Sequence, residues 1–163
     1  TIRNADLAAL LTDGLGFEDV RPVLASGNVI FETQAAPAAR ASIKASIETA
    51  LRERFGYDAW IVLVTRAEVQ AAIEAFPFDA AADDRQPWVV FGSDDAILTE
   101  LSEAAASFDQ DADPVARGSG VIYWNPVKGT TVDTPFGKLL ARRAYRSSTT
   151  NRNLRTLEKI VAR

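Results

Sequence analysis

Two segments in the first third of the chain repeat apolar residues every three or four positions, as the buried face of a helix does. They span residues 5–15 and 36–55. The buried stripe of the second helix consists of Ile43, Ile47, Leu51 and Phe55. A further helix is expected over 67–76, because Thr65 and Glu68 have the spacing of a capping box.

Short apolar runs predict the strands of the same region. The runs 20–24 and 29–31 flank a loop that contains Gly and Asn. Because these two residue types tolerate the positive φ of a tight turn, the runs are expected to form a β-hairpin. The continuous apolar run 59–64 predicts a third strand.

Residues 77–87 interrupt this regularity, since they are rich in Asp, Ala and Pro, and we interpret them as a connector. A second unit is expected to begin with a strand over 88–91. A helix that starts at Asp94 or Asp95 follows it, and a second hairpin is expected over 115–124.

Two helices are predicted in the last part of the chain. Thr134 followed by Pro135 is typical of a helix start, and this helix is expected to reach about Tyr145. A polar loop over 147–151 separates it from a final helix that begins near Asn153.

The predicted order is therefore αββαβα, a connector, and βαββαα. We expect an α+β fold with two small subdomains, over 1–78 and 88–163, joined by a connector over 79–87. The first is expected to be ferredoxin-like, a split βαβ arrangement that lacks its first strand in this chain. The second is expected to be a related βαββ unit that ends in two helices.

The composition narrows the chemistry that the chain can perform. Its 163 residues contain no Cys and no His, which excludes disulfides and thiolate chemistry and removes the commonest general base. No apolar run approaches the roughly 20 residues of a membrane helix. We expect a cytoplasmic protein, because missing cysteines fit a reducing compartment. We also expect no membrane partner, no cofactor and no metal. The start at Thr1 and the lack of Met predict that a segment precedes the chain.

Basic residues are concentrated at the end of the chain. Residues 117–163 carry ten Lys and Arg against two Asp and Glu, whereas residues 1–116 carry eight against twenty. One face of the protein is therefore expected to attract anions while another repels them.

Motifs in several parts of the chain point to one family. Residues 15–31 read LGFEDVRPVLASGNVIF, Pro77 precedes Phe78, and residues 152–156 read RNLRT. In this order they resemble the DUF1697 family of bacterial proteins of unknown function, whose patterns are LGFxxVxTxxxSGNVxF, Asn-Pro-Phe and TxRNWxT. The family's opening LRGINVGG is absent, and Leu154 stands where the family often has Trp. The resemblance implies an α+β fold of two related subdomains and carries no established activity.

The first candidate site is the predicted hairpin loop formed by Ser26, Gly27 and Asn28. Its backbone N–H groups and the Asn28 amide are suited to hold a ligand. The alternative is a plain turn in which Asn28 satisfies the backbone of its own loop.

The second candidate is the helix start at 134–138. Free N–H groups at a helix start attract anions, Gly137 would let a ligand approach closely, and Lys138 adds a charge, so this helix start is one candidate for phosphate or carboxylate binding. The spacing is not that of a P-loop. The alternative is an ordinary capped helix.

The third candidate is Arg152, Asn153 and Arg155. Further arginines lie upstream at Arg142, Arg143 and Arg146. Arg152 and Arg155 share a helix face if the helix has already begun, and Arg forms paired hydrogen bonds to carboxylate or phosphate. Alternatively, these arginines lock the last helix onto acidic parts of the same chain, or the Arg-Asn pair forms a cap together with a buried ion pair.

Two further signals are weaker. Residues 109–113 have the opening rhythm of a calcium loop, but Pro114 and Gly120 stand where that loop needs Gly and Glu, so a solvated acidic loop is expected. Aromatic residues lie within the basic segment, as is typical of proteins that bind single strands, although an apolar strand also explains them. These aromatic residues are Tyr123, Trp124 and Tyr145.

We therefore predict a non-catalytic binding module for an anionic ligand that carries phosphate or carboxylate. The favoured residues are Lys138, Arg142, Arg152, Asn153 and Arg155, with Ser26, Gly27 and Asn28 added if the subdomains face each other. Two alternatives remain open: an enzyme that uses Asp and Glu or Arg and Lys, and a single-stranded nucleic-acid binder.

Overall fold

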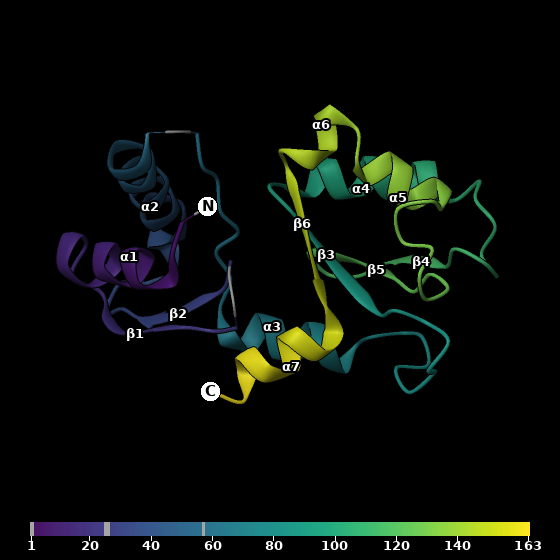
Figure 1. Cartoon of the computed structure of the whole chain (residues 1–163), viewed down its shortest axis with the longest axis horizontal. Coiled ribbons are helices and arrows are strands. Elements are labelled where there is room, and N and C mark those ends of the chain that lie inside the picture. The colour runs from purple at the N-terminus through teal and green to yellow at the C-terminus, as the bar shows by residue number, and fades with distance from the viewer. Residues whose placement is uncertain (1, 25–26, 57) are drawn as a thin grey trace. The chain divides into compact units, whose positions relative to one another are not determined.

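The computed structural model describes residues 2–24, 27–56 and 58–163. Its contacts divide the chain into two compact units, Thr1–Leu63 with Ala162–Arg163 and Val64–Val161 (Figure 1). Each unit combines helices with a small antiparallel sheet, so the predicted α+β class with two subdomains is confirmed.

The first unit begins with α1 (Asn4–Ala9), which continues as a π-helical turn, η1 (Leu10–Gly14). The strands β1 (Glu18–Pro22) and β2 (Val29–Glu32) pair antiparallel, which confirms the predicted hairpin. A 3-10 turn, η2 (Pro37–Ala39), leads into α2 (Arg40–Phe55). The left-handed Gly56 ends α2, with φ of 78°.

A small apolar core holds the first unit together. Leu11 of η1 and Ile47 and Leu51 of α2 are buried, and the rings of Phe17 and Phe31 stack on each other at 4.4 Å. Ile47 and Leu51 belong to the predicted stripe, and Ile43 and Phe55 pack beside them. The period of apolar residues therefore identified the correct face of α2.

The prediction of a strand over 59–64 is wrong. These residues form no strand, although Ala59 and Ile61 pack against the core of the first unit. The backbone N–H of Ile61 donates to the Glu48 carboxylate at 2.9 Å instead of to a neighbouring strand. Apolar residues direct the segment inward, but a strand also needs a paired backbone, which the apolar pattern does not supply.

The second unit begins with α3 (Arg66–Glu74), whose capping box of Thr65 and Glu68 is formed as predicted. Strand β3 (Trp88–Gly92) and helix α4 (Asp95–Ala105) follow the irregular residues 77–87. Asp94 caps α4 by accepting a hydrogen bond from the N–H of Ile97 at 2.9 Å.

The rest of the second unit contains three more strands and three helices within the described residues. They are β4 (Val115–Arg117), β5 (Val121–Trp124), α5 (Pro135–Leu140), α6 (Arg143–Arg146), β6 (Thr149–Asn153) and α7 (Leu154–Val161). The sheet has the order β4-β5-β3-β6, and all its neighbours are antiparallel. With α4 and α5–α6 as connections, this βαββαβ order is the split βαβ arrangement.

Helices cover both faces of this sheet (Figure 1). On one face, Val90, Ile122 and Trp124 form a buried core with residues of α4, α5 and α6. On the other face, the Tyr123 hydroxyl donates to the Ala72 carbonyl of α3 at 2.7 Å, and α7 packs beside α3. Successive side chains of a strand point to opposite faces of the sheet, so neighbouring residues such as Tyr123 and Trp124 pack on different faces.

Two predictions about the last 30 residues or so are wrong in detail. The helix from Pro135 ends at Leu140, because Arg142 has an extended backbone (ψ of 145°) and separates α5 from α6. The polar loop expected over 147–151 is largely the strand β6, which pairs with β3 from Thr149 to Asn153. The sequence TTNRN lacks the apolar alternation of a strand, since the sheet rather than the side chains determines this pairing.

The division between the units differs from the connector expected over 79–87. It falls between Leu63 and Val64, so that α3 belongs to the second unit. The reason is the contact of α3 with α7 and with Tyr123, which joins α3 to the sheet of the second unit. Within the described residues, no helix is long and apolar enough to cross a membrane.

Candidate functional site

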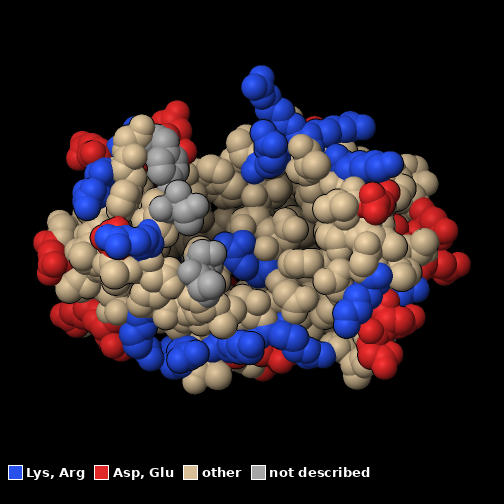
Figure 2. Space-filling model, viewed as in Figure 1, with Lys and Arg blue, Asp and Glu red and all other residues tan. Residues whose placement is uncertain are grey.

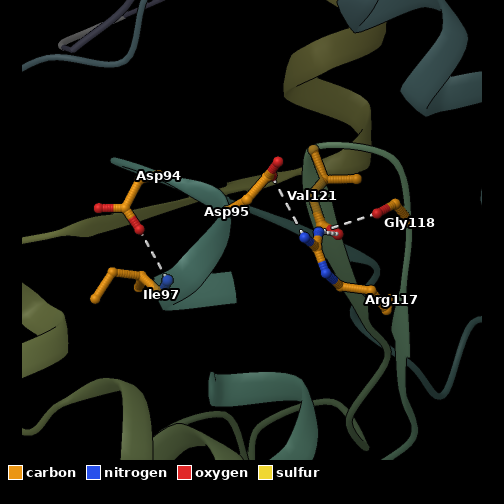
Figure 3. Close-up of polar contacts among 6 residues, drawn as sticks. All are labelled: Asp94, Asp95, Ile97, Arg117, Gly118 and Val121. Atoms are coloured by element: carbon orange, nitrogen blue, oxygen red, sulfur yellow. Dashed lines mark hydrogen bonds and ion pairs between the residues drawn. The ribbon is translucent and has the colours of Figure 1, made fainter. Parts of the chain in front are cut away.

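The first cation of the basic segment is held by the chain itself (Figure 3). The Arg117 guanidinium donates to the backbone carbonyls of Gly118 and Val121 at 3.0 and 3.1 Å. It also lies 3.4 Å from the carboxylate of Asp95, at the start of α4. Arg117 therefore fixes the β4–β5 turn and is not presented to a ligand.

The predicted anion site at the start of α5 is filled by a carboxylate of the same chain. Asp113 is 1% exposed and accepts hydrogen bonds from the Trp124 Nε1–H at 2.6 Å and the backbone N–H of Phe136 at 2.9 Å. The Thr134 hydroxyl accepts from the N–H of Gly137 at 3.0 Å. This helix start is thus an ordinary capped one, as the alternative interpretation held.

Gly137 has a packing role rather than a ligand role. A Cβ atom at this position would lie 1.8 Å from the carbonyl oxygen of Thr131. The backbone of the 126–134 loop approaches α5 this closely only because residue 137 has no side chain. The space beside Gly137 that was expected to admit an anion is therefore taken by the Thr131 carbonyl.

Arg152 and Arg155 do not share a helix face, because the helix begins only at Leu154 and the condition for that prediction is not met. Arg152 lies in β6, where its guanidinium donates to the Thr150 hydroxyl and to the Asn151 carbonyl. Burial lowers the pKa of Arg152 below the ordinary value for arginine. Arg155 lies in α7, one residue after the helix has begun.

Asn153 and Arg155 stabilise α7 through contacts within the second unit. The Asn153 side-chain oxygen accepts from the N–H of Arg155 at 2.9 Å, so Asn153 caps the helix. The Arg155 guanidinium pairs with Glu158 at 2.8 Å and donates to the Ala80 carbonyl. The cap agrees with the alternative given for the Arg-Asn pair, but the ion pair of Arg155 is exposed rather than buried.

Four other cations, unlike Arg117 and Arg155, have no carboxylate beside them among the described residues. Lys138, Arg142, Arg143 and Arg146 are all exposed, and we call this group the α5–α6 basic surface. Within the described part of the chain, none of the four forms an ion pair. Basic side chains extend outward over α6 and its surroundings (Figure 2).

Tyr145 anchors the α5–α6 basic surface to α4. Its hydroxyl lies 2.5 Å from the Glu100 carboxylate, and this hydrogen bond, with a smaller contribution from burial, raises the pKa of Tyr145. The positive charge of Arg142 acts in the opposite direction on the same pKa. Arg142 is therefore close enough to this buried ring for its charge to be felt there.

The sheet of the second unit separates the favoured residues into two groups. Lys138 and Arg142 belong to the α5–α6 layer, which covers the face of Val90 and Trp124. Arg155 belongs to α7, which packs with α3 on the opposite face. The residues favoured from the sequence therefore do not converge on one site.

The loop at 26–28 supports the turn interpretation as far as it is described. Ser26 lies outside the described residues. Gly27 has φ of 80°, and the Asn28 carbonyl accepts from the N–H of Val23 at 2.9 Å. Both residues belong to the first unit.

Other candidates have structural explanations. The Asp109 carboxylate accepts from the N–H of Asp111 at 2.9 Å, as in a closed acidic turn. Among the residues that the structure describes, no group of three or more Asp and Glu side chains is placed to hold a metal ion. An open hollow of about 420 Å³ lies on α2, lined mainly by small residues and by a single carboxylate, that of Glu53.

The aromatic residues of the basic segment are buried. Tyr123, Trp124 and Tyr145 are 3%, 1% and 9% exposed. Trp124 packs edge-on against Phe136 at 5.2 Å, and Tyr123 packs in the same way against Phe76 at 5.6 Å. These rings form the cores on both faces of the sheet, so they offer no surface on which unpaired bases stack.

Sequence reasoning gave too little weight to Arg143 and Arg146 and missed Asp113. The two arginines were recognisable from the density of cations over 138–146. Asp113 gave no signal of its own, because it resembles the other acidic residues of its loop until the fold places it beside Trp124.

Comparison with known proteins finds a family whose sequences resemble this chain and a solved structure with a similar fold. The chain belongs to the family described as "Protein of unknown function (DUF1697)", which matches residues 1–123. It is similar in structure to a conserved bacterial protein from Streptococcus pneumoniae, with a TM-score of 0.80 and 22% identity over 99% of this chain and 88% of that chain. At this identity the likeness shows the fold alone. No curated protein matches the chain.

Proposed function

We propose that this protein is a non-catalytic binding module for an anionic ligand, and that the ligand binds at the α5–α6 basic surface. The observation that supports this proposal is the set of four exposed cations within residues 138–146 that have no acidic partner among the described residues. The same proposal assigns the protein to the cytoplasm, because a chain without cysteine fits a reducing compartment.

The electrostatics favour this surface over the other basic residues. Arg117 and Arg155 already lie beside carboxylates, which reduces the potential that they present to a ligand. Arg142, Arg143 and Arg146 are exposed and have no acidic partner among the described residues, and a phosphate or carboxylate can form paired hydrogen bonds with a guanidinium. The proposed site therefore keeps Lys138 and Arg142 from the residues favoured by the sequence. It adds Arg143 and Arg146.

Chemical-shift perturbation tests the proposal with two small anions, inorganic pyrophosphate and citrate. We expect the backbone signals of residues 138–146 and the guanidinium signals of their arginines to shift as either anion is added. The double variant R143A/R146A should weaken this response several-fold, because two of the four cations are removed.

A matched control separates the site from the net charge. The variant K128A/K159A also removes two exposed cations, which lie outside the α5–α6 basic surface. It should respond to both anions as the wild type does. Equal weakening in the two double variants, or shifts centred elsewhere in the chain, would reject the proposed site.

A further inference from the structure

We propose that the anionic ligand is the phosphate backbone of a double-stranded nucleic acid; this inference rests on the proposed function. The α5–α6 basic surface consists of exposed side chains on two short helices and the turn between them, and the apolar residues Leu139, Leu140 and Tyr145 of these helices are buried. These four cations are exposed, lie within nine residues of the chain and have no acidic partner among the described residues, so they suit a ligand that itself presents many charges in a row.

The burial of the aromatic rings argues for a duplex rather than a single strand. Proteins that bind single strands stack bases on exposed aromatic side chains. Tyr123, Trp124 and Tyr145 are at most 9% exposed, so the rings of the basic segment are not available for stacking. A paired duplex keeps its bases stacked internally and presents its phosphates outward, which requires only cations from the protein.

The same surface lacks what a membrane contact needs. A helix that lies on a bilayer inserts large apolar side chains between its basic residues. Between Lys138 and Arg146 the exposed apolar residues are Ala141 and Ala144, whose side chains are single methyl groups. The surface therefore offers charge without an apolar anchor.

The choice of cation also fits phosphate. Three of the four residues are arginines, Arg142, Arg143 and Arg146, and a guanidinium can donate two parallel hydrogen bonds to one phosphate group. Contact through phosphates alone carries no base sequence, so we expect binding without sequence preference. If each of the four cations contacts one phosphate, a plot of the logarithm of the association constant against the logarithm of the salt concentration should have a slope of about −3.6. Fewer contacts would give a shallower slope.

Fluorescence anisotropy with a labelled duplex of about 20 base pairs tests this inference. Non-specific affinity of the usual order is expected, with a dissociation constant of roughly 1 to 100 μM, tightening at low salt. R143A/R146A should reduce the salt slope by about 2 and weaken binding about tenfold or more, because two phosphate contacts are lost. K128A/K159A should bind the duplex as the wild type does.

Three competitors distinguish the occupants of the surface. A single strand of the same sequence, polyglutamate and vesicles containing phosphatidylserine are each compared with the duplex. Tighter binding of the duplex, lost in R143A/R146A alone, supports the inference. Equal binding of the single strand, preference for polyglutamate or vesicles, or equal losses in both double variants would overturn it. If pyrophosphate still shifts residues 138–146, the proposed function survives that failure.

Discussion

Arg155 of α7 and Arg143 of α6 come from the same basic stretch of sequence, yet the protein uses them differently. Arg155 pairs with Glu158 and reaches the Ala80 carbonyl, and the neighbouring Asn153 caps α7. Arg143 is exposed and forms no ion pair with any described residue. In the β6–α7 segment, cations and amides hold the fold together, whereas the cations of the α5–α6 basic surface are exposed and form no ion pair among the described residues.

This difference shows why the charge of a segment does not locate a binding site. The sum over residues 117–163 is strongly positive, but Arg117, Arg152 and Arg155 contribute to it while they serve the chain's own structure. The fold determines which cations have partners within the chain and which do not. Substitutions in the two regions should therefore separate stability from binding.

The largest effect is expected at the start of α5, where Asp113→Ala removes the acceptor of two buried donors. The Trp124 Nε1–H and the N–H of Phe136 would both lose their partner, which should lower the free energy of unfolding by about 3 kcal/mol. Urea denaturation measures this loss. Asp113→Asn keeps one acceptor oxygen and should lose less, and a loss below about 1 kcal/mol in the alanine variant would contradict the role assigned to Asp113.

A smaller effect is expected at the start of α7. Asn153→Ala removes the acceptor for the N–H of Arg155, and the loss of such a cap typically costs about 1 kcal/mol. Asn153→Asp keeps the acceptor and serves as the control in thermal and urea denaturation. If the alanine variant bound pyrophosphate less tightly than the aspartate variant at equal stability, Asn153 would belong to the ligand site instead.

Arg155→Ala tests the comparison between the two regions directly. Its partner Glu158 and its own side chain are 42% and 51% exposed, so the ion pair is screened by solvent and the loss of stability should be about 0.5 kcal/mol. Duplex and pyrophosphate binding should not change. The reverse is expected for Arg143→Ala, which should keep the wild-type melting temperature and bind anions more weakly. Similar binding losses in both variants would show that the two regions do not differ in ligand binding.

The smallest effect concerns the pKa of Tyr145, followed through the ultraviolet absorbance of tyrosinate. Arg142→Ala should raise this pKa further, since the Arg142 charge lowers it, and Glu100→Gln should lower it by removing the main cause of its rise. A raised pKa in the folded state means that stability is fully present below the ordinary tyrosine pKa and is lost as pH rises through the raised value. An unchanged pKa in both variants would show that Tyr145 senses neither group.

Elements that local sequence determines were predicted well. The capping box at Thr65, the Asp94 cap and the stripe of Ile47 and Leu51 depend on residues within a few positions of each other. Pairing across the sheet was not accessible in this way. The polar strand β6 is formed because β3 offers it a backbone partner, and residues 59–64 form no strand although their side chains are apolar.

The candidate site was predicted only in part for the same reason. Lys138 and Arg142 were selected from charge and from the helix start, and both are exposed. The engagement of Arg155 with Ala80 and the placement of Asp113 beside Phe136 join residues far apart in the chain. Contacts of this kind decide which cations are available, and no pattern of neighbouring residues records them.

The position of Arg152 has a consequence for solubility. β6 is the last strand of its sheet, and the bonds from Ser93 to Ser148 and from Leu154 to Pro87 set a register in which the Asn151 carbonyl points away from β3. The Arg152 guanidinium donates a hydrogen bond to that carbonyl. A strand from another molecule that added itself to this edge would have to displace a charged side chain first, which protects the protein from edge-to-edge aggregation.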